Sequence, residues 1–388
     1  MATPAISQDE ELHWLALRMV PGLGTRGAYN LIEKFKSPQA IFRASASELE
    51  GAALSPSLAR TISSGCTFEE AVDQQEQLRE AGATVITLYD PLYPERLRGI
   101  YDPPVVLFAK GRTELIGSYG ISVVGTRRPS PYGLAAAERL SADLAQAGLT
   151  ITSGMARGID TAAHKAALSV NGSTLAVFGC GVDMLYPADN RRLYDQIARS
   201  GLMVSEFPMG TPAYPQNFPI RNRIVSGLSL GVVVIEGAQH SGSAITARLA
   251  SEQSREVFAV PGNITSKMSW APNLLIKQGS AKLVQEWSDI TNELSPQVRR
   301  DLVNRGQQIL MSAGETALDS HDRDAVSPLP QLSQRILQSL KVDESKQLDD
   351  LVESFEGVSS SEMIAALFDL EMNGFIRQLP GRQFVKVW

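Results

Sequence analysis

The spacing of apolar residues along the chain changes near residue 120. From there to about residue 260, short continuous apolar runs alternate with helical windows. Continuous runs are typical of strands buried on both faces, and strands separated by helices indicate a parallel sheet. The runs lie at 121–124, 149–152, 174–178, 202–205, 232–235 and 257–260, and the helical windows at 133–147, 161–170, 190–199 and 244–254. The pattern therefore predicts a doubly wound α/β domain.

The first part of the chain has helical spacing instead. Its longer helices are predicted at 11–19, 25–35 and 70–81. The β-branched run 84–88 and a Pro-rich passage then lead to another apolar run at 105–108. We expect an N-terminal helical domain over residues 1–82 and the α/β domain over 83–295.

The last part of the chain predicts a small separate domain. Residues 296–330 are polar and lack periodicity, as in a flexible linker. Beyond them the pattern predicts helices at 332–340, 347–354 and 359–373, then strands at 375–379 and 383–388 joined by Pro380-Gly381-Arg382. Three helices followed by a hairpin are typical of a winged helix, which we expect over 331–388.

Composition excludes several classes of protein. The 388 residues are 43% hydrophobic, yet no apolar run approaches the ~18 residues of a membrane helix, and the first residues lack the features of a signal peptide. The two cysteines, Cys66 and Cys180, favour reduced thiols in the cytoplasm over a disulfide framework. The four histidines have no metal-ligand spacing, and Gly-Lys, which a Walker A loop requires, never occurs. We predict no metal and no cofactor.

Charge is distributed unevenly along the chain. The whole chain carries −6, but residues 101–295 hold 17 basic and 15 acidic side chains, a net +2. Residues 1–100 carry −4 and residues 331–388 carry −3. A mildly positive centre between acidic ends does not by itself identify a nucleic-acid-binding protein. The positions of the arginines are more informative.

The string Gly22-Leu23-Gly24-Thr25-Arg26-Gly27 matches the dinucleotide-binding pattern G-x-G-x-x-G. It follows a helix and not a strand, so a nucleotide cofactor is not expected there. Two interpretations remain open. The segment is either a helix-hairpin-helix whose free amides meet a phosphate, or a purely structural helical hairpin.

Two glycine-containing turns follow successive strands of the α/β domain. Arg127 and Arg128 come directly after the run 121–124, at a strand end where open α/β folds bind ligands. Guanidinium groups suit phosphate, although Arg127 could instead pair with a carboxylate. The next strand leads into a turn that alone could be a tight structural turn. Because two such turns follow successive strands, we expect its free amides and side chains to face an anion. The predicted contacts in this second turn are Ser153, Gly154, Arg157 and Gly158.

Two further segments add to the predicted anion site. Phe218, Arg221, Asn222 and Arg223 lie in what we read as a loop, where an aromatic ring stacks a base and the arginines follow the backbone. The alternatives are a buried phenylalanine and internal salt bridges.

Ser241, Gly242 and Ser243 begin a helix after the run 232–235, so hydroxyls and amides there face the same edge. Although His240 precedes Ser241, there is no nucleophile elbow, and we predict no catalytic residue.

Seven ordered blocks between about residues 90 and 285 closely resemble the DNA-processing protein A family, called DprA or Smf. They are VVGTRRPSPYG, TSGMARGIDTAAH, FGCGVDMLYP, SEFP, FPIRNRIVSGLS, VVVIEGAQHSGSAITARLA and REVFAVPGN. The upstream segment YPERLRGIYDPPVVLFAKG also matches. One departure is Ala271-Pro272 before Asn273, where the family usually has a glycine.

The resemblance implies a function that the residues alone do not. Members of this family are not known as enzymes. They bind single-stranded DNA during natural transformation, protect it and load RecA recombinase onto it. The resemblance also implies an extended Rossmann-like domain that forms a homodimer, with a sterile-alpha-motif-like domain before it and a winged helix after it.

The family's DNA contacts carry over to Arg127, to the turn 153–158, to 218–223 and to 241–243. The net −3 of the winged helix weakens a role in gripping DNA and leaves a protein-contact or regulatory role open.

Two other functions compete with this expectation. The same crevice could belong to a nucleotide or nucleoside-phosphate hydrolase, although the Pro-Gly-Gly-x-Gly-Thr loop typical of such families is missing from the sequence. It could also belong to a nucleotide sensor that signals through the winged helix.

Overall fold

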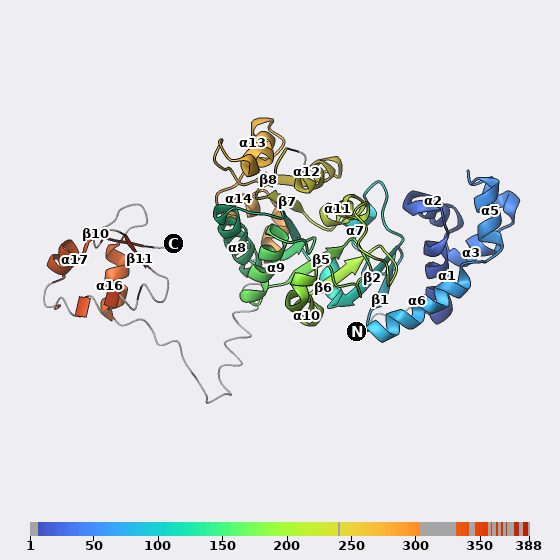
Figure 1. Ribbon diagram of the computed structural model, residues 1–388, viewed down its shortest axis with the longest axis horizontal. Helices are drawn as coiled ribbons and strands as arrows, with labels where there is room; N and C mark the ends of the chain where they lie inside the picture. The colour runs from blue at the N-terminus through green and yellow to red at the C-terminus, as the bar shows by residue number, and fades with distance from the viewer. Residues whose placement is uncertain are drawn as a thin grey trace, which may run out of the picture. The chain divides into compact units, whose positions relative to one another are not determined.

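The computed structural model describes residues 7–239, 241–302, 331–340 and 346–355, with shorter stretches at 358, 362–363, 366–367, 370, 376–379 and 383–386. The chain forms two compact units, Met1–Ser312 and Ala313–Trp388 (Figure 1). The first unit contains the N-terminal helices and the large sheet. Among the described residues, no helix combines the length and apolar character needed to cross a bilayer.

The N-terminal part is helical, as predicted. Serine side chains cap several of its helices: Ser7 begins α1, Ser37 begins α3, Ser45 begins α4 and Ser55 begins α5. The helices are α1 (Gln8–Met19), α2 (Gly24–Phe35), α3 (Pro38–Arg43), α4 (Ala46–Glu50), α5 (Pro56–Ser63) and α6 (Phe68–Ala81). The three predicted helices match α1, α2 and α6 to within about three residues.

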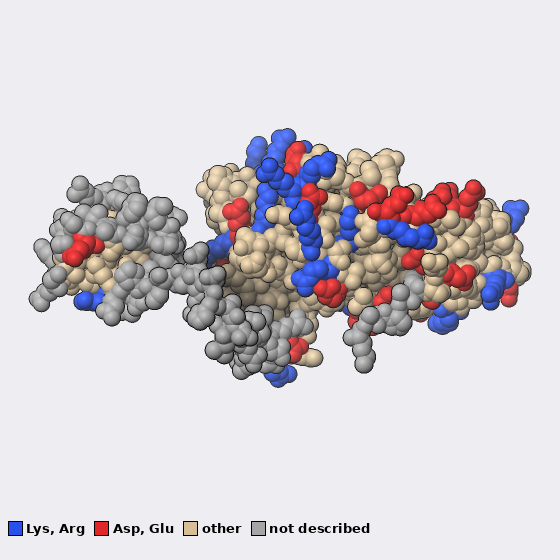
Figure 2. All heavy atoms as spheres, turned by 90° about the horizontal axis from the view of Figure 1, so that it is seen from below, with Lys and Arg blue, Asp and Glu red and all other residues tan. Residues whose placement is uncertain are grey.

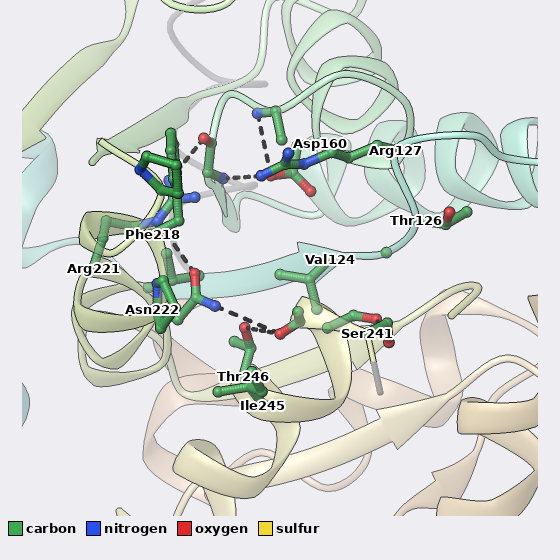
Figure 3. A pocket seen from close by; sticks show the side chains of 18 of the residues that line it. Val124, Thr126, Arg127, Asp160, Phe218, Arg221, Asn222, Ser241, Ile245 and Thr246 are labelled. Atoms are coloured by element: carbon green, nitrogen blue, oxygen red, sulfur yellow. Dashed lines mark hydrogen bonds between the residues drawn. The ribbon is translucent and has the colours of Figure 1, made fainter. Parts of the chain in front are cut away.

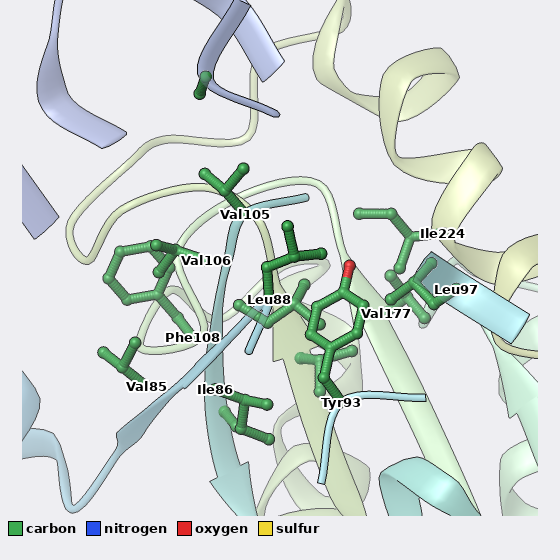
Figure 4. Close-up of a cluster of buried hydrophobic side chains, with 14 of the residues drawn as sticks. Val85, Ile86, Leu88, Tyr93, Leu97, Val105, Val106, Phe108, Val177 and Ile224 are labelled. Carbon is green, nitrogen blue, oxygen red and sulfur yellow. The ribbon is translucent and has the colours of Figure 1, made fainter. Parts of the chain in front are cut away.

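One hydrophobic core continues from these helices into the sheet. It runs from Trp14 and Leu31 to Val106 and Ile224 without a break. Figure 4 shows its central part, where Tyr93 lies between the residues of the first two strands and the pair formed by Leu97 and Ile224. The N-terminal helices are therefore packed firmly against the α/β part of the chain.

The sheet has nine strands in the order β1-β2-β6-β5-β4-β3-β7-β8-β9. They are β1 (Thr84–Thr87), β2 (Val106–Gly111), β3 (Gly120–Val124), β4 (Thr150–Ser153), β5 (Thr174–Phe178), β6 (Leu202–Ser205), β7 (Gly231–Val234), β8 (Glu256–Ala259) and β9 (Lys282–Leu283). From β6 to β9 all neighbours are parallel, which confirms the doubly wound α/β fold. The edge differs from a fully parallel sheet, because β1 and β2 are antiparallel to their neighbours.

Helices cover both faces of the sheet (Figure 1). The longer ones are α8 (Pro131–Gln146), α9 (Ile159–Ser169), α10 (Arg191–Ser200), α11 (Asn217–Gly227) and α12 (Gly242–Glu252). Ile121 and Val123 of β3 pack against α8 and α9. Val232 and Val234 of β7 join the core that contains α11 and α12. Every central strand is thus buried on both faces, which is why its sequence is continuously apolar.

Shorter elements connect these helices and strands. They are α7 (Glu95–Arg98), η1 (Thr113–Gly117), η2 (Ala188–Asn190), η3 (Lys267–Ser269), α13 (Trp270–Lys277) and α14 (Trp287–Thr291). Ala271 and Pro272, where the sequence departs from the family pattern, lie in the first turn of α13, a position that tolerates proline because no intrahelical N–H bond is needed. The following Asn273 exchanges two side-chain hydrogen bonds with the backbone of Gly262. The two residues that depart from the family pattern therefore form part of the first turn of α13.

The predicted linker begins too early. Residues 296–302 are helical, and Val298 and Leu302 are buried in the core against α8. The Asp301 carboxylate also accepts a hydrogen bond of 2.7 Å from the Tyr119 hydroxyl. The prediction failed here because two apolar residues are too few to show a period. Residues 303–330 lie outside the described part of the chain.

The second unit contains the predicted hairpin. Its described elements are α16 (Gln331–Ser339), β10 (Lys346–Gln347), α17 (Leu348–Ser354), β11 (Ile376–Leu379) and β12 (Gln383–Lys386). Strand β12 pairs antiparallel with β11 and also with β10. The third predicted helix is represented by helical residues at 362–363, 366–367 and 370. The turn 380–382 lies outside the described residues.

Candidate nucleic-acid interface

A pocket of about 450 Å³ opens where the chain leaves the carboxyl ends of β3, β4 and β7. The sheet order reverses at this point, because β4 lies on one side of β3 and β7 on the other. Such reversal points are where open α/β sheets bind ligands. Eight predicted residues line the pocket: Arg127, Gly154, Phe218, Arg221, Asn222, Ser241, Gly242 and Ser243. Figure 3 labels Arg127 on the loop after β3, Phe218, Arg221 and Asn222 on α11, and Ser241 at the start of α12.

Arg127 is exposed on the loop that follows β3. Its guanidinium carbon lies 5.5 Å from the centre of the Phe218 ring, and none of the ion pairs among the described residues includes it. The buried Glu236 carboxylate accepts a hydrogen bond of 2.9 Å from the Ser130 backbone and another from the Ser130 hydroxyl, which holds this loop. Arg128 is also exposed but does not line the pocket.

The segment that contains Phe218 is a helix and not the predicted loop. It forms the first turns of α11, and Pro219 lies in the first turn, where proline is tolerated. The Phe218 ring is partly buried and lies 5.4 Å from the Tyr186 ring, with an angle of 40° between the two planes. The helix thus holds Phe218 rigidly at the side of the pocket.

The two arginines of α11 are buried, contrary to the open position expected of them. Arg221 donates to the carbonyls of Gly154, at 2.7 Å, and Val177. Arg223 pairs with Glu206 at 2.8 Å and Asp102 at 2.9 Å, so the alternative of internal salt bridges is correct for it. Arg223 does not line the pocket, and its role is to fasten α11.

The turn between β4 and α9 is closed by its own side chains. The Asp160 carboxylate accepts hydrogen bonds from the backbone N–H groups of Gly154 at 3.2 Å and Ala156 at 3.3 Å. The Ser153 hydroxyl is buried and donates to the Val123 carbonyl at 2.7 Å. Burial raises the pKa of Asp160, while Arg221 and these amides act in the opposite direction. The expectation of free amides and an available Ser153 was therefore wrong.

Gly158 and Arg157 have different surroundings in the same turn. Gly158 has a φ of +80°, and a Cβ there would overlap the Thr126 carbonyl oxygen, so the backbone requires glycine. Arg157 is 61% exposed and pairs with Asp189 at 2.7 Å. It does not line the main pocket but belongs to an adjoining cavity.

The start of α12 remains open. The Ser241 hydroxyl accepts a hydrogen bond from the Ala244 backbone at 3.4 Å and lies 2.8 Å from the Ser243 hydroxyl. Gly242 is exposed, and neither its N–H nor that of Ser243 has an acceptor within the described residues. Amides at a helix N-terminus favour an anion. The predicted site is best preserved here; His240 lies outside the described residues.

One residue of the N-terminal glycine string, Thr25, is bonded to a buried carboxylate, Glu206. The Thr25 hydroxyl, at the start of α2, donates to Glu206 at 2.5 Å, and Arg18 donates to the Glu206 carbonyl at 3.1 Å. Burial opposes ionisation of Glu206, but Arg223, Arg18 and the hydrogen bonds outweigh it and lower its pKa. This geometry favours the structural interpretation of the hairpin.

Several residues around the site were not predicted as part of it, although they lie in the blocks that carry the family resemblance. Glu206 and Tyr186 have no recognisable spacing because their partners, Arg223 and Phe218, come from other segments of the chain. Asp160 lies near the Gly154 and Ala156 amides in the sequence, but a single acidic residue at the start of a helix is not distinctive. His164 is buried beneath the site, where burial and then Arg221 lower its pKa to about 3, so it stays neutral. Its ring accordingly contributes to packing and to a contact of 2.6 Å with Thr174. The described residues contain no group of His, Cys, Asp or Glu suited to a metal ion.

One face of the first unit has an uneven distribution of basic and acidic side chains, although both kinds occur in each part of it (Figure 2). On the face shown in Figure 2, Lys and Arg gather over the part that contains the sheet, whereas Asp and Glu form a row over the N-terminal helices. Fold and site together define a Rossmann-like protein with a pocket at the point where the sheet order reverses, the place where open α/β sheets bind ligands.

Comparison with known families identifies the protein more closely. The family model described as DNA recombination-mediator protein A matches residues 84–295, and the DprA winged helix domain matches residues 321–382. The chain belongs to this family, which is a family of DNA-processing proteins. The resemblance inferred from the sequence is confirmed.

Individual relatives agree with this assignment. Protein Smf of Escherichia coli is 42% identical over 291 residues, which are 74% of each chain. DNA processing protein DprA of Bacillus subtilis is 43% identical over 217 residues, 56% of this chain and 73% of the relative.

Two solved structures are also similar. DNA processing protein A of Streptococcus pneumoniae has a TM-score of 0.63 at 34% identity, and the match covers 75% of this chain and 99% of that one. DNA processing protein A of Helicobacter pylori, described for its single-stranded DNA binding mode, has a TM-score of 0.50 at 30% identity, covering 55% of this chain and 96% of that one.

Proposed function

We propose that the protein binds single-stranded DNA in the pocket at the carboxyl ends of β3, β4 and β7, without catalysing a reaction on it. The observation that carries this proposal is the position of Arg127. Its exposed guanidinium shares one pocket with the Phe218 ring and with the open start of α12. A positive group, an aromatic face and unpaired amides are the features with which proteins hold a single strand.

Each group has a distinct task in this proposal. One phosphate contacts Arg127. A neighbouring phosphate accepts hydrogen bonds from the backbone N–H groups of Gly242 and Ser243. A base stacks on the exposed part of Phe218, whose position is held by α11. Buried Arg221 and Arg223 keep α11 in place and do not contact the strand. Duplex DNA is excluded because its bases are already stacked on one another.

We extend the proposal to the wider role that the family resemblance implies. The protein protects strands taken up in natural transformation, loads RecA onto them and acts as a homodimer in the cytoplasm. The description of the family as recombination mediators supports the link with RecA. The relative from Helicobacter pylori, described as binding single-stranded DNA, supports the choice of ligand. Both cysteines are unpaired, as suits a reducing compartment.

Removal of the Arg127 side chain tests the proposal. Arg127→Ala should weaken binding of a fluorescent thymidine oligonucleotide at least tenfold, because a charge-assisted hydrogen bond contributes about 1.5–3 kcal/mol. The slope of log affinity against log salt should also fall by about 0.7. Arg139→Ala is the matched control, since Arg139 is a 52% exposed arginine of α8 outside the pocket.

The same titration addresses the competing functions. Equal affinities of Arg127→Ala and the unsubstituted protein would contradict the proposed site. Tighter binding of a mononucleotide than of the oligonucleotide would favour a nucleotide sensor. Release of phosphate or base from nucleotides by the pure protein, lost in Arg127→Ala, would favour a hydrolase.

A further inference from the structure

A second cavity, of about 290 Å³, adjoins the main pocket. Arg127, Ala156 and Tyr186 line both cavities, so the two meet along these three residues. Arg127 lies at the junction and is exposed. A ligand that leaves the main pocket past Arg127 therefore enters a space that is already formed.

Tyr186 provides an aromatic surface in this space. Its side chain is 39% exposed, and its ring lies 5.4 Å from the Phe218 ring. Rings this close contact each other, so no base fits between them. Phe218 lines only the main pocket, whereas Tyr186 also lines the second cavity. The two ring planes meet at an angle of 40°, and because the rings line different cavities, each is available to a different base.

The remaining lining suits a nucleotide. Arg157 brings a second guanidinium, and Leu185 and Pro187 bring apolar surface. Arg157 pairs with Asp189 at 2.7 Å, but the two side chains are 61% and 65% exposed. An ion pair this exposed contributes little to stability, so a phosphate can replace Asp189 as the partner of Arg157. Arginine beside an exposed aromatic ring is the chemistry that binds single strands.

We propose that the second cavity binds the nucleotide next to the one held on Phe218, and that Tyr186 stacks its base. This inference rests on the proposed function and adds a subsite to it. Arg127 contacts the phosphodiester that joins the two nucleotides, and Arg157 contacts the following phosphate. The strand then runs from the start of α12 across Arg127 toward the loop before η2.

The test measures what a second base contributes to binding. One probe is an oligonucleotide of abasic sugars with a single thymine, and the other has two adjacent thymines. For the unsubstituted protein, the second thymine should raise affinity at least fivefold, as a stacked base does. Two identical bases that share one site would give only about twofold, by statistics. In Tyr186→Ala the gain should fall to about twofold, and in Tyr186→Phe, which keeps the ring, it should return.

The outcomes separate this inference from the proposed function. A gain of about twofold in the unsubstituted protein would overturn the second subsite, whatever the variants do. A fivefold gain that persists in Tyr186→Ala would overturn the role of Tyr186. If Arg127→Ala weakens binding in either of these cases, the proposed function stands without the second subsite. If Arg127→Ala does not change the affinity for the oligonucleotide, both the second subsite and the proposed function are overturned. Thermal unfolding of Tyr186→Ala checks its fold, and the probe comparison in the unsubstituted protein does not depend on that variant.

Discussion

Two turns beside the central strand β3 have similar sequences and opposite surroundings. One leads from β4 into α9 and the other from β7 into α12, and both contain serine and glycine. In the first turn, the Asp160 carboxylate accepts hydrogen bonds from two backbone N–H groups, and Arg221 donates a hydrogen bond to the Gly154 carbonyl. In the second turn, the amides of Gly242 and Ser243 have no acceptor among the described residues. A glycine-containing helix start is available to a ligand only if no carboxylate of the protein occupies it.

The turn before α2 resembles the closed one. There Glu206, from the segment after β6, accepts the hydrogen bond of Thr25. Both closed turns are held by a buried carboxylate that lies near a buried arginine, Asp160 near Arg221 and Glu206 near Arg223. We expect substitutions at the closed turns to change stability, and substitutions at the open turn to change ligand binding.

The largest effect is expected at Glu206. Glu206→Ala leaves Arg18 without its charged neighbour and Arg223 with Asp102 as its remaining partner. Breaking a buried ion pair in this way costs about 3–5 kcal/mol. Urea unfolding should show this loss. Glu114→Ala, which removes an exposed ion pair with Arg112, is the control and should change stability by less than about 1 kcal/mol.

Glu206 also predicts an acid-dependent loss of stability. Because its folded pKa is lowered, its ionisation stabilises the fold fully above the ordinary value of 4.5. This contribution is lost as the pH falls below 4.5 and through the lowered folded pKa. Glu206→Gln should flatten the dependence of unfolding free energy on pH in this range. An unchanged slope would show that other carboxylates account for the loss.

Two glycine substitutions compare the turns directly. Gly158→Ala should destabilise the protein by about 3 kcal/mol, since alanine is strained at a φ of +80° and its Cβ overlaps the Thr126 carbonyl. Gly242→Ala should leave stability nearly unchanged, because nothing lies within 4 Å of the new Cβ. Thermal unfolding of both variants measures the difference. Equal losses would mean that the second turn is as constrained as the first.

Two arginines of the pocket should separate stability from binding. Arg221→Ala leaves the carbonyls of Gly154 and Val177 without a buried donor, at a cost of about 1–3 kcal/mol for each unsatisfied group. Arg127→Ala should not change the unfolding free energy, although it weakens oligonucleotide binding. Chemical unfolding measures the unfolding free energy of each variant, and a titration measures its affinity for the oligonucleotide. Loss of stability in both variants would remove the distinction.

The smallest effect is expected at Ser241. Its hydroxyl caps α12 through the Ala244 backbone, so Ser241→Ala should cost about 1 kcal/mol. Ser241→Asp keeps a capping oxygen and should retain the stability, but its negative charge should weaken oligonucleotide binding, since it stands where a phosphate is expected. Weak binding by Ser241→Ala and normal binding by Ser241→Asp would contradict an anion site at this helix start.

The hydrophobic pattern alone predicts the strands β3 to β8, the helices α8, α9, α10 and α12, and the region of the pocket. Val232 to Val234 are apolar without interruption because strands buried on both faces meet no solvent. In the run from Ile121 to Val124 the one polar residue, Ser122, is buried and donates a hydrogen bond to the Val225 carbonyl. Parallel strands bring their carboxyl ends to one edge, so motifs after β3, β4 and β7 had to converge. Arg127 and Gly242 were placed correctly in the pocket by this reasoning alone.

Which of the converging groups are open depends on contacts between segments that are distant in the sequence. Arg223 and Arg127 look alike in the sequence, but Glu206 and Asp102 bury the first and no carboxylate within the described residues pairs with the second. The segment at Phe218 is helical and not the expected loop, because packing of Ile224 and Val225 against the sheet stabilises α11. Burial and charge pairing are properties of neighbours in space, and those neighbours come from distant parts of the chain.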